Sequence, residues 1–199
     1  MGEEYQGLKY KVIMLGDQCP DHPLIPELIH WCGRFHDSGL APAYPGGSYG
    51  NLSFRIKAGE EPFIITGTCI GLKDDLCSDH LVRVERADLQ ANTVYACGSR
   101  MPSSESMMHW AVYRERPEIM AVFHGHSPEI LRHHSLLGLA VSGQEWPYGS
   151  TELAGCMAGL ARSHDFFIAR EHGFISLGKD MEQAGQMAFE ILSKAQEQG

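Results

Sequence analysis

The segment that constrains the fold most is 121–126, in which the apolar run Ala-Val-Phe leads directly into His124, Gly125 and His126. An apolar run that enters a glycine predicts a short buried strand reaching its end. Alternate strand residues share a face, so His124 and His126 point the same way, with Cα atoms about 6.5 Å apart. Two imidazoles at this spacing can hold one metal ion. With 11 histidines in 199 residues, such a pair is expected by chance, so it does not by itself distinguish a metal site from ordinary histidines.

Strand patterns and helix patterns are interspersed along the chain. Short alternating or apolar runs predict strands at 8–14, 52–56, 63–67, 81–85, 121–123, 139–142 and 166–169. Helical spacing and end signals predict helices at 24–35 (ending by Gly39), from 102–105 to 116, at 127–131, at 151–162 after an N-cap at Ser150, and at 181–196. In the second helix we expect a serine N-cap with an acidic residue in the first turn. Two apparent hairpins favour a mixed sheet with helices on its faces over a purely parallel one.

The chain as a whole excludes several classes of protein. Its length of 199 residues, 43% hydrophobic and 21% charged, suits a single globular domain spanning 1–199. The net charge of −9 argues against a nucleic-acid partner or an anionic membrane. We find no secretory signal and no apolar run of membrane-spanning length. The six scattered cysteines indicate reduced thiols, so we expect a cytoplasmic protein.

Two further residues extend the histidine pair. His172 follows the apolar run 166–169 and precedes a glycine, so a third imidazole could reach the same ion if the two strand ends lie side by side. Three histidines with one open position are typical of catalytic zinc. Glu105, at the predicted start of a helix, could ligate such a metal, act as a general base, or do both in turn. Each residue also has an ordinary explanation: Glu105 could complement the helix dipole, and His172 could be a buried, hydrogen-bonded histidine.

Several loop residues offer contacts for an anion. Each combines a hydroxyl, an amide or a permissive backbone with the boundary of an element: Asn51, Thr66, Gly67, Ser103 and Ser104. The two serines also precede a predicted helix, whose free N–H groups favour a phosphate. The same residues could equally serve only to form turns.

A set of motifs occurs in the order found in one known family. They are Gly47-Ser48-Tyr49-Gly50-Asn51-Leu52-Ser53-Phe54-Arg55, Ile64-Ile65-Thr66-Gly67, Met101-Pro102-Ser103-Ser104-Glu105 with His109 and Tyr113, Arg116-Pro117, His124-Gly125-His126-Ser127, and Glu171-His172-Gly173 with Gly178 and Glu182-Gln183-Ala184. Over roughly residues 24 to 195 the chain resembles the class II aldolase/adducin family. Any one motif is weak, but the set in this order is highly specific.

The resemblance implies a three-layer α/β/α domain around a largely antiparallel sheet, assembled as a homotetramer with active sites at subunit interfaces. It implies Zn²⁺, or another divalent metal, held by His124, His126 and His172. Glu105 matches the family's acid/base carboxylate, which can also ligate the metal. The phosphate-binding positions match Asn51, Thr66, Gly67, Ser103 and Ser104. The implied substrate is a small phosphorylated sugar, cleaved or formed through a metal-stabilised enediolate of dihydroxyacetone phosphate, as in L-fuculose-1-phosphate aldolase.

The segment from Ser127 to Tyr148 departs from the sugar-phosphate aldolases. It is short, and it lacks an alignable counterpart of the tyrosine that protonates the leaving aldehyde; Tyr148 and Glu145 are the nearby candidates. Three hypotheses therefore stand. The first is a zinc-dependent aldolase, and the second is another enzyme of this fold: a ribulose-phosphate 4-epimerase, a methylthioribulose-phosphate dehydratase or a decarboxylase. The third is a non-catalytic interaction domain like the adducin head.

Overall fold

The computed structural model describes residues 7–198, and within them nine strands form one sheet in the order β1-β7-β6-β5-β4-β8-β11-β10-β9. Their bounds are β1 (Lys11–Gly16), β4 (Asn51–Arg55), β5 (Phe63–Thr66), β6 (Leu81–Asp88), β7 (Thr93–Cys97), β8 (Ala121–Gly125), β9 (Ala140–Val141), β10 (Phe166–Ala169) and β11 (Gly173–Gly178). Only the outer pairs β1–β7 and β9–β10 are parallel. The expectation of a mixed, largely antiparallel sheet is confirmed.

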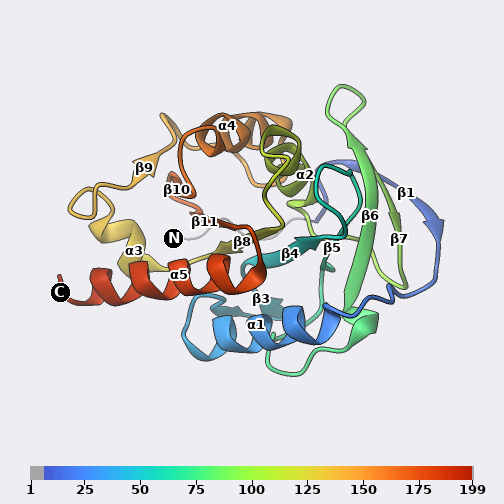
Figure 1. Cartoon of the computed structure of the whole chain (residues 1–199), viewed down its shortest axis with the longest axis horizontal. Coiled ribbons are helices and arrows are strands. Elements are labelled where there is room, and N and C mark those ends of the chain that lie inside the picture. Colours follow the sequence, from blue (N-terminus) through green and yellow to red (C-terminus); the bar gives the residue numbers. More distant parts are fainter. Residues whose placement is uncertain (1–6, 199) are drawn as a thin grey trace.

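Helices cover both faces of this sheet, which confirms the three-layer α/β/α architecture (Figure 1). One layer holds α1 (Ile25–Asp37), α3 (Pro128–His133) and α5 (Met181–Gln196), and the other holds α2 (Ser106–Glu115) and α4 (Thr151–Ala161). A short ribbon of β2 (Ala43–Tyr44) and β3 (Gly47–Ser48) and a 3₁₀ turn, η1 (Ser78–His80), lie in the connections. None of the helices in the described part of the chain is long and apolar enough to cross a membrane.

The alternation of strand side chains decides which layer each residue meets. In β8, Ala121 and Phe123 join the core beneath α1 and α5, whereas Val122 joins the core beneath α2 and α4. By the same period of two, His124 faces the side on which α2 lies. Glu105 stands at the N-terminus of α2. The alternation in β8 therefore brings the His124 imidazole and the Glu105 carboxylate to the same face of the sheet.

The helix ends agree with the sequence except at α2. Ser150 caps α4 and Ser127 caps α3, each accepting a backbone N–H with its side chain. We expected α2 to begin with a serine cap near Ser103, but it begins at Ser106, and Glu105 occupies the N-cap without a side-chain cap bond. The reason is that the backbone N–H and the hydroxyl of Ser106 both donate to the carbonyl of Ser103, which forms a turn, and Glu105 directs its carboxylate toward histidines instead.

Two strands of the main sheet, β7 and β11, were not anticipated from the sequence, and neither was the short β2–β3 ribbon. β11 is fully buried, and its residues Gly173–Gly178 pair with both β8 and β10. Its sequence, with glycine at both ends and a central serine, lacks the alternation that marks a half-exposed strand.

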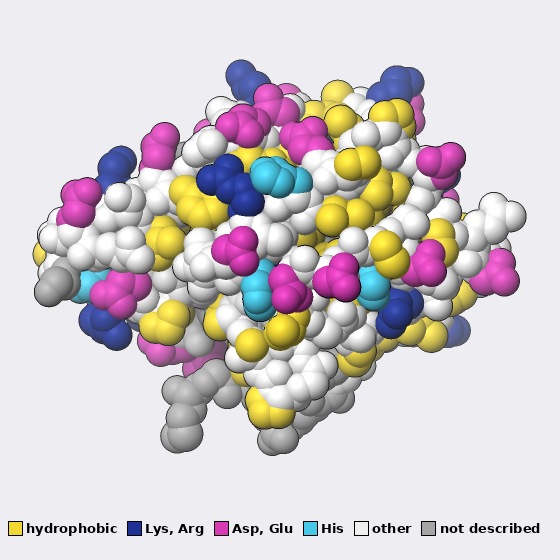
Figure 2. Space-filling model, turned by 90° about the horizontal axis from the view of Figure 1, so that it is seen from below, with side chains coloured by type: hydrophobic (Ala, Val, Ile, Leu, Met, Phe, Trp, Pro, Cys, Tyr) yellow, Lys and Arg dark blue, Asp and Glu magenta, His cyan; other side chains and the backbone are white. Residues whose placement is uncertain are grey.

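The face seen from below in Figure 2 carries acidic, basic and histidine side chains interspersed with apolar ones. Among the described residues on this face there is no extended basic surface of the kind that binds nucleic acid. The lack of a basic surface on this face agrees with the net charge of −9.

The packing of α5 on α1 gives a test of the fold. A Cβ at Gly185 would lie 2.2 Å from the buried ring of Trp31, so Gly185→Ala forces the two helices apart. We expect it to lower the free energy of unfolding by about 1–3 kcal/mol in a urea titration. The matched control is Gly159→Ala in α4, where a Cβ meets nothing within 4 Å; alanine there should stabilise by up to about 1 kcal/mol. Equal effects of the two substitutions would contradict this packing.

Candidate metal centre and substrate pocket

Four side chains from separate segments converge at the C-terminal end of β8, an inner strand of the sheet. Glu105 precedes α2, His124 lies in β8, His126 follows β8, and His172 lies in the turn between β10 and β11. We expected His172 at a strand end; it stands three residues past β10, and the pairing of β11 with β8 brings it beside His124. The sheet therefore unites residues that are 67 positions apart in the chain.

The glycines beside these histidines permit the close approach. A Cβ at Gly125 would lie 2.8 Å from the carbonyl oxygen of Leu40 and 2.5 Å from the ring of Phe174. A Cβ at Gly173 would lie 2.5 Å from the carbonyl oxygen of Gly125 and 2.7 Å from the ring of His124. Larger side chains at either glycine would push the two strands, and the imidazoles they carry, apart.

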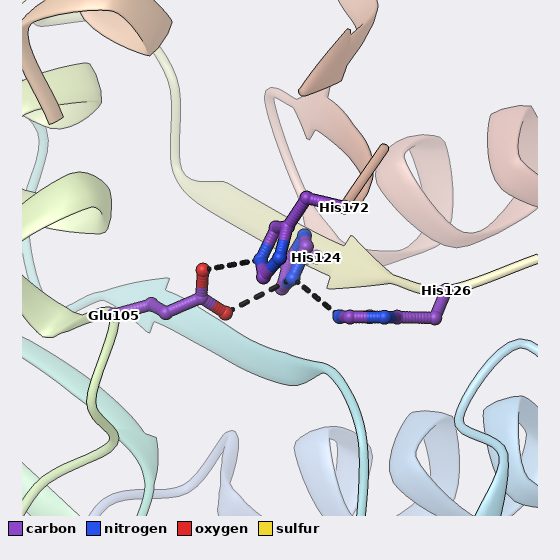
Figure 3. A group of neighbouring side chains, drawn as sticks. All are labelled: Glu105, His124, His126 and His172. Carbon is purple, nitrogen blue, oxygen red and sulfur yellow. Dashed lines mark hydrogen bonds and ion pairs between the residues drawn. The ribbon is translucent and has the colours of Figure 1, made fainter. Parts of the chain in front are cut away.

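The ligand atoms of these four side chains all lie within 4.8 Å of one another. Nε2 of His124 is 3.0 Å from Nε2 of His126 and 2.9 Å from Oε2 of Glu105. Nε2 of His172 is 2.8 Å from Oε1 of the same carboxylate. In Figure 3 the carboxylate approaches His124 and His172 from one side, and the ring of His126 enters from the other.

The chemistry of this donor set fits a divalent cation. Nδ1 of His124 lies 2.8 Å from the carbonyl oxygen of Phe174, which can only accept, so Nδ1 carries the hydrogen. In a neutral ring Nε2 then presents a lone pair, and it faces a carboxylate oxygen and another imidazole nitrogen. Converging lone pairs need a positive charge between them, and an outer N–H donated to a backbone carbonyl is the usual arrangement for a ligating histidine.

The electrostatics of the cluster favour deprotonated ligands. Burial acts to raise the pKa of Glu105, but the charges of His124 and His172, and their hydrogen bonds, outweigh it and hold that pKa well below its usual range. Burial, followed by the charges of His172 and His124, lowers the pKa of His126 well below its usual range. An ionised Glu105 and an unprotonated His126 are the forms that bind a metal.

A pocket opens beside the cluster and holds about 770 Å³ of empty space, part of it open to solvent. A concave site with polar side chains that converge on it is the usual setting for a small ligand. Four of the five predicted phosphate-binding residues line it: Asn51, Gly67, Ser103 and Ser104. Thr66 does not line it; its side chain is buried at the end of β5, and its hydroxyl has no hydrogen-bond partner among the described residues. Phosphate binding by these five residues stays a prediction.

Sequence reasoning missed Lys73, which is only 2% exposed and lines the pocket. Its Nζ donates to the carbonyl oxygens of Ser48 (3.2 Å) and Tyr49 (3.0 Å) and to the Ser48 hydroxyl (2.9 Å). The ring of Tyr49 stacks on His126, with centroids 4.9 Å apart. Lys73 therefore holds the loop that supports one of the candidate ligands. A lone lysine before Asp74 and Asp75 resembles an exposed loop residue, so no local signal marks it.

The two residues considered for the missing tyrosine lie in different surroundings. Tyr148 is buried and lines the pocket, and its hydroxyl donates to the carbonyl oxygen of Gly7 at 3.2 Å. Glu145 is exposed and is not among the residues that line the pocket. Of the pair, only Tyr148 is placed to meet a ligand.

Comparison with known proteins agrees with this geometry. A model of the Class II Aldolase and Adducin N-terminal domain matches residues 26–198. The chain belongs to this family. An L-fuculose phosphate aldolase of Haemophilus influenzae is 31% identical over 192 residues, covering 84% of this chain and 78% of the relative. A 3-oxo-tetronate 4-phosphate decarboxylase of Escherichia coli K12 is 27% identical over 177 residues, covering 79% of each.

A solved structure of L-fuculose 1-phosphate aldolase shares the fold, with a TM-score of 0.72 at 22% identity, covering 89% of this chain and 85% of that one. Family membership and fold are thus established for this chain. The curated family members named above are enzymes, one an aldolase and the other a decarboxylase. The family's use of a divalent metal agrees with the cluster of Glu105 and three histidines.

We expect purified protein to contain about one divalent metal ion per chain by elemental analysis. His172→Ala removes one donor of the cluster and should lower metal affinity by at least 10²-fold, because the remaining groups no longer surround the ion. His164→Ala, at an exposed histidine, is the control and should keep its metal. Metal retention by His172→Ala would contradict the assignment of this cluster.

The lowered pKa of Lys73 leads us to expect that the stability of the protein depends on pH. Burial lowers its pKa from 10.5 to about 8, so between these values the unfolded chain binds the proton and the folded chain does not. Stability should therefore rise with pH across this window, by an amount on the order of a few kcal/mol. Urea titrations of wild type and Lys73→Met at pH 7.5 and 10 measure the difference. A gap between the two proteins that is the same at both pH values would contradict the shift.

Proposed function

We propose that this protein is a metal-dependent lyase that cleaves or forms a carbon–carbon bond next to the carbonyl of a small phosphorylated sugar. The observation that carries the proposal is the cluster of the Glu105 carboxylate with three imidazoles beside a partly open pocket. A resident metal, for which Zn²⁺ is the first choice, requires nitrogen and carboxylate ligands of this kind. The aldolase relatives of 28–31% identity support the same class of substrate.

Different residues would have different roles in such a reaction. A divalent cation bound by the histidines would stabilise negative charge that develops on substrate oxygens. Glu105, buried and ionised, is the group placed to remove a proton from substrate and return it, which typically contributes about 10²–10⁴ in rate. Ser103, Ser104 and Gly67 lie on the pocket wall, where the two serine hydroxyls could bind a phosphate. The backbone N–H of Gly67 already donates to the carbonyl oxygen of His80.

Decarboxylation of a phosphorylated keto acid is the second candidate. The relatedness to a 3-oxo-tetronate 4-phosphate decarboxylase favours it, and the same cation would stabilise the charge left behind when carbon dioxide departs. The two reactions differ at the end of the substrate that lies away from the phosphate, and the pocket-lining residues Tyr148 and Glu171 are candidates to contact that end. The family resemblance further supports a homotetramer with active sites between subunits, and the free cysteines support a cytoplasmic location.

Incubation with dihydroxyacetone phosphate in deuterated water tests the proposal. We expect exchange of one carbon-bound hydrogen, followed by NMR, and a fall of about 10²–10⁴-fold in Glu105→Gln, which lacks the base. The exposed carboxylate of Glu145 gives the control, since Glu145→Gln should exchange like wild type. The absence of exchange in metal-loaded wild type would overturn the aldolase proposal. A screen of ketose phosphates and keto-acid phosphates would then separate cleavage, epimerisation, dehydration and decarboxylation products.

A further inference from the structure

A chain of buried side chains leads from Glu105 into the interior of the protein. Oε2 of Glu105 is 2.8 Å from Nδ2 of Asn51, and Oδ1 of Asn51 is 2.6 Å from Nε2 of His109. Nδ1 of His109 is 2.7 Å from Oγ of Ser53, which is 2.8 Å from the hydroxyl of Tyr113. His109 and Ser53 are fully buried, and the other members are at most 6% exposed. From His109 inward, the hydrogen-bonded side chains are therefore shielded from bulk water.

This hydrogen-bonded series follows from the side-chain periodicity of β4 and α2. Asn51 and Ser53 are two residues apart in β4, so they share a face. Glu105, His109 and Tyr113 are spaced four apart at the start of and along α2, so they form one stripe. The strand face meets the helix stripe, and the contacts pass between the two elements in turn. A shift of either element by one residue would break every contact.

Only one arrangement of hydrogens satisfies the short contacts. The ionised Glu105 only accepts, so the Asn51 amide turns its nitrogen to the carboxylate and its oxygen to His109. Nε2 of His109 must then donate, and in a neutral ring Nδ1 accepts from the Ser53 hydroxyl. Ser53 also lies 3.3 Å from the carbonyl oxygen of Val122, a longer contact than the 2.7 Å to His109. Tyr113 donates to Ser53, so every donor in the chain points toward Glu105.

We propose that His109 is a positioning residue that fixes the Glu105 carboxylate through Asn51. A ligating imidazole nitrogen has no hydrogen to donate. With His124 and His172 bound to a metal, Asn51 is the side-chain donor that remains on Glu105 among the described residues. The orientation of the base then depends on which way the Asn51 amide faces, and His109 sets that. Its catalytic consequence rests on the proposed function, whereas the hydrogen-bond arrangement does not.

The direct test is nitrogen-15 NMR of the metal-loaded protein. His109 should appear as a neutral ring with its hydrogen on Nε2, assigned by loss of the signal in His109→Gln. One hydrogen of the Asn51 amide should be shifted downfield by its bond to Glu105. In His109→Leu this shift should collapse, and in Tyr113→Phe it should persist, because the tyrosine lies at the far end of the chain. A ring protonated on Nδ1, or an Asn51 signal unchanged in His109→Leu, would overturn the proposal.

The kinetics of hydrogen exchange on dihydroxyacetone phosphate distinguish a positioning role of His109 from a purely structural role. We expect His109→Leu to lower kcat by about 10–100-fold with one metal per chain retained, since the four candidate metal ligands are unchanged. His109→Gln, which can both donate to Asn51 and accept from Ser53, should restore most of kcat. Tyr113→Phe should stay within about threefold of wild type. An unchanged kcat in His109→Leu, or equal losses in the Gln and Leu variants, would contradict positioning.

Two safeguards keep the outcomes distinct. If His109→Leu does not unfold cooperatively, Ser53→Ala replaces it, because it removes the donor that holds His109 in the Nε2–H form. If metal-loaded wild type shows no exchange, the aldolase proposal fails, and the Asn51 and His109 resonances still decide the positioning role.

Discussion

The pairing of β8 with β4 on one side and β11 on the other is the constraint on which the site depends. Through β4, residue Asn51 lies opposite His124; through β11, the turn carrying His172 lies beside Gly125. The sheet therefore brings three imidazoles, and the amide that holds the Glu105 carboxylate, to one end of these strands. Gly125 and Gly173 allow this approach, because each stands where a Cβ would collide with neighbouring backbone.

Burying these groups has an electrostatic consequence. A carboxylate taken out of water is unfavourable unless it is paired and hydrogen-bonded. Here Glu105 faces His124 and His172, whose charges and hydrogen bonds lower its pKa despite burial. His109, with no carboxylate in direct contact, shows the opposite balance: burial lowers its pKa to about 3, so it stays neutral. Two ionisable groups at neighbouring positions of one helix stripe thus have different protonation states, set by their partners.

The elements were predictable where local signals were strong. The last helix, α5, matches its predicted bounds of 181–196, and the Ser150 cap of α4 was visible in the sequence. β11 was missed, because a strand buried on both faces lacks the alternating pattern that marks a half-exposed one. β7 was also missed, although buried and half-buried residues alternate from Val94 to Cys97. The start of α2 was displaced to Ser106, because the turn at Ser103 and the contacts of Glu105 override cap preference.

The sequence by itself determined the fold class, the family and the candidate metal-binding residues, because apolar periodicity and an ordered set of motifs are local properties of the chain. Only the tertiary structure decided which groups act on which. It buried Lys73 beneath the loop of Tyr49, turned Asn51 toward Glu105, and placed His109 behind that amide. The physical reason is that hydrogen bonds and charges act over a few ångströms between residues 24 to 58 positions apart, and only the tertiary packing sets those distances.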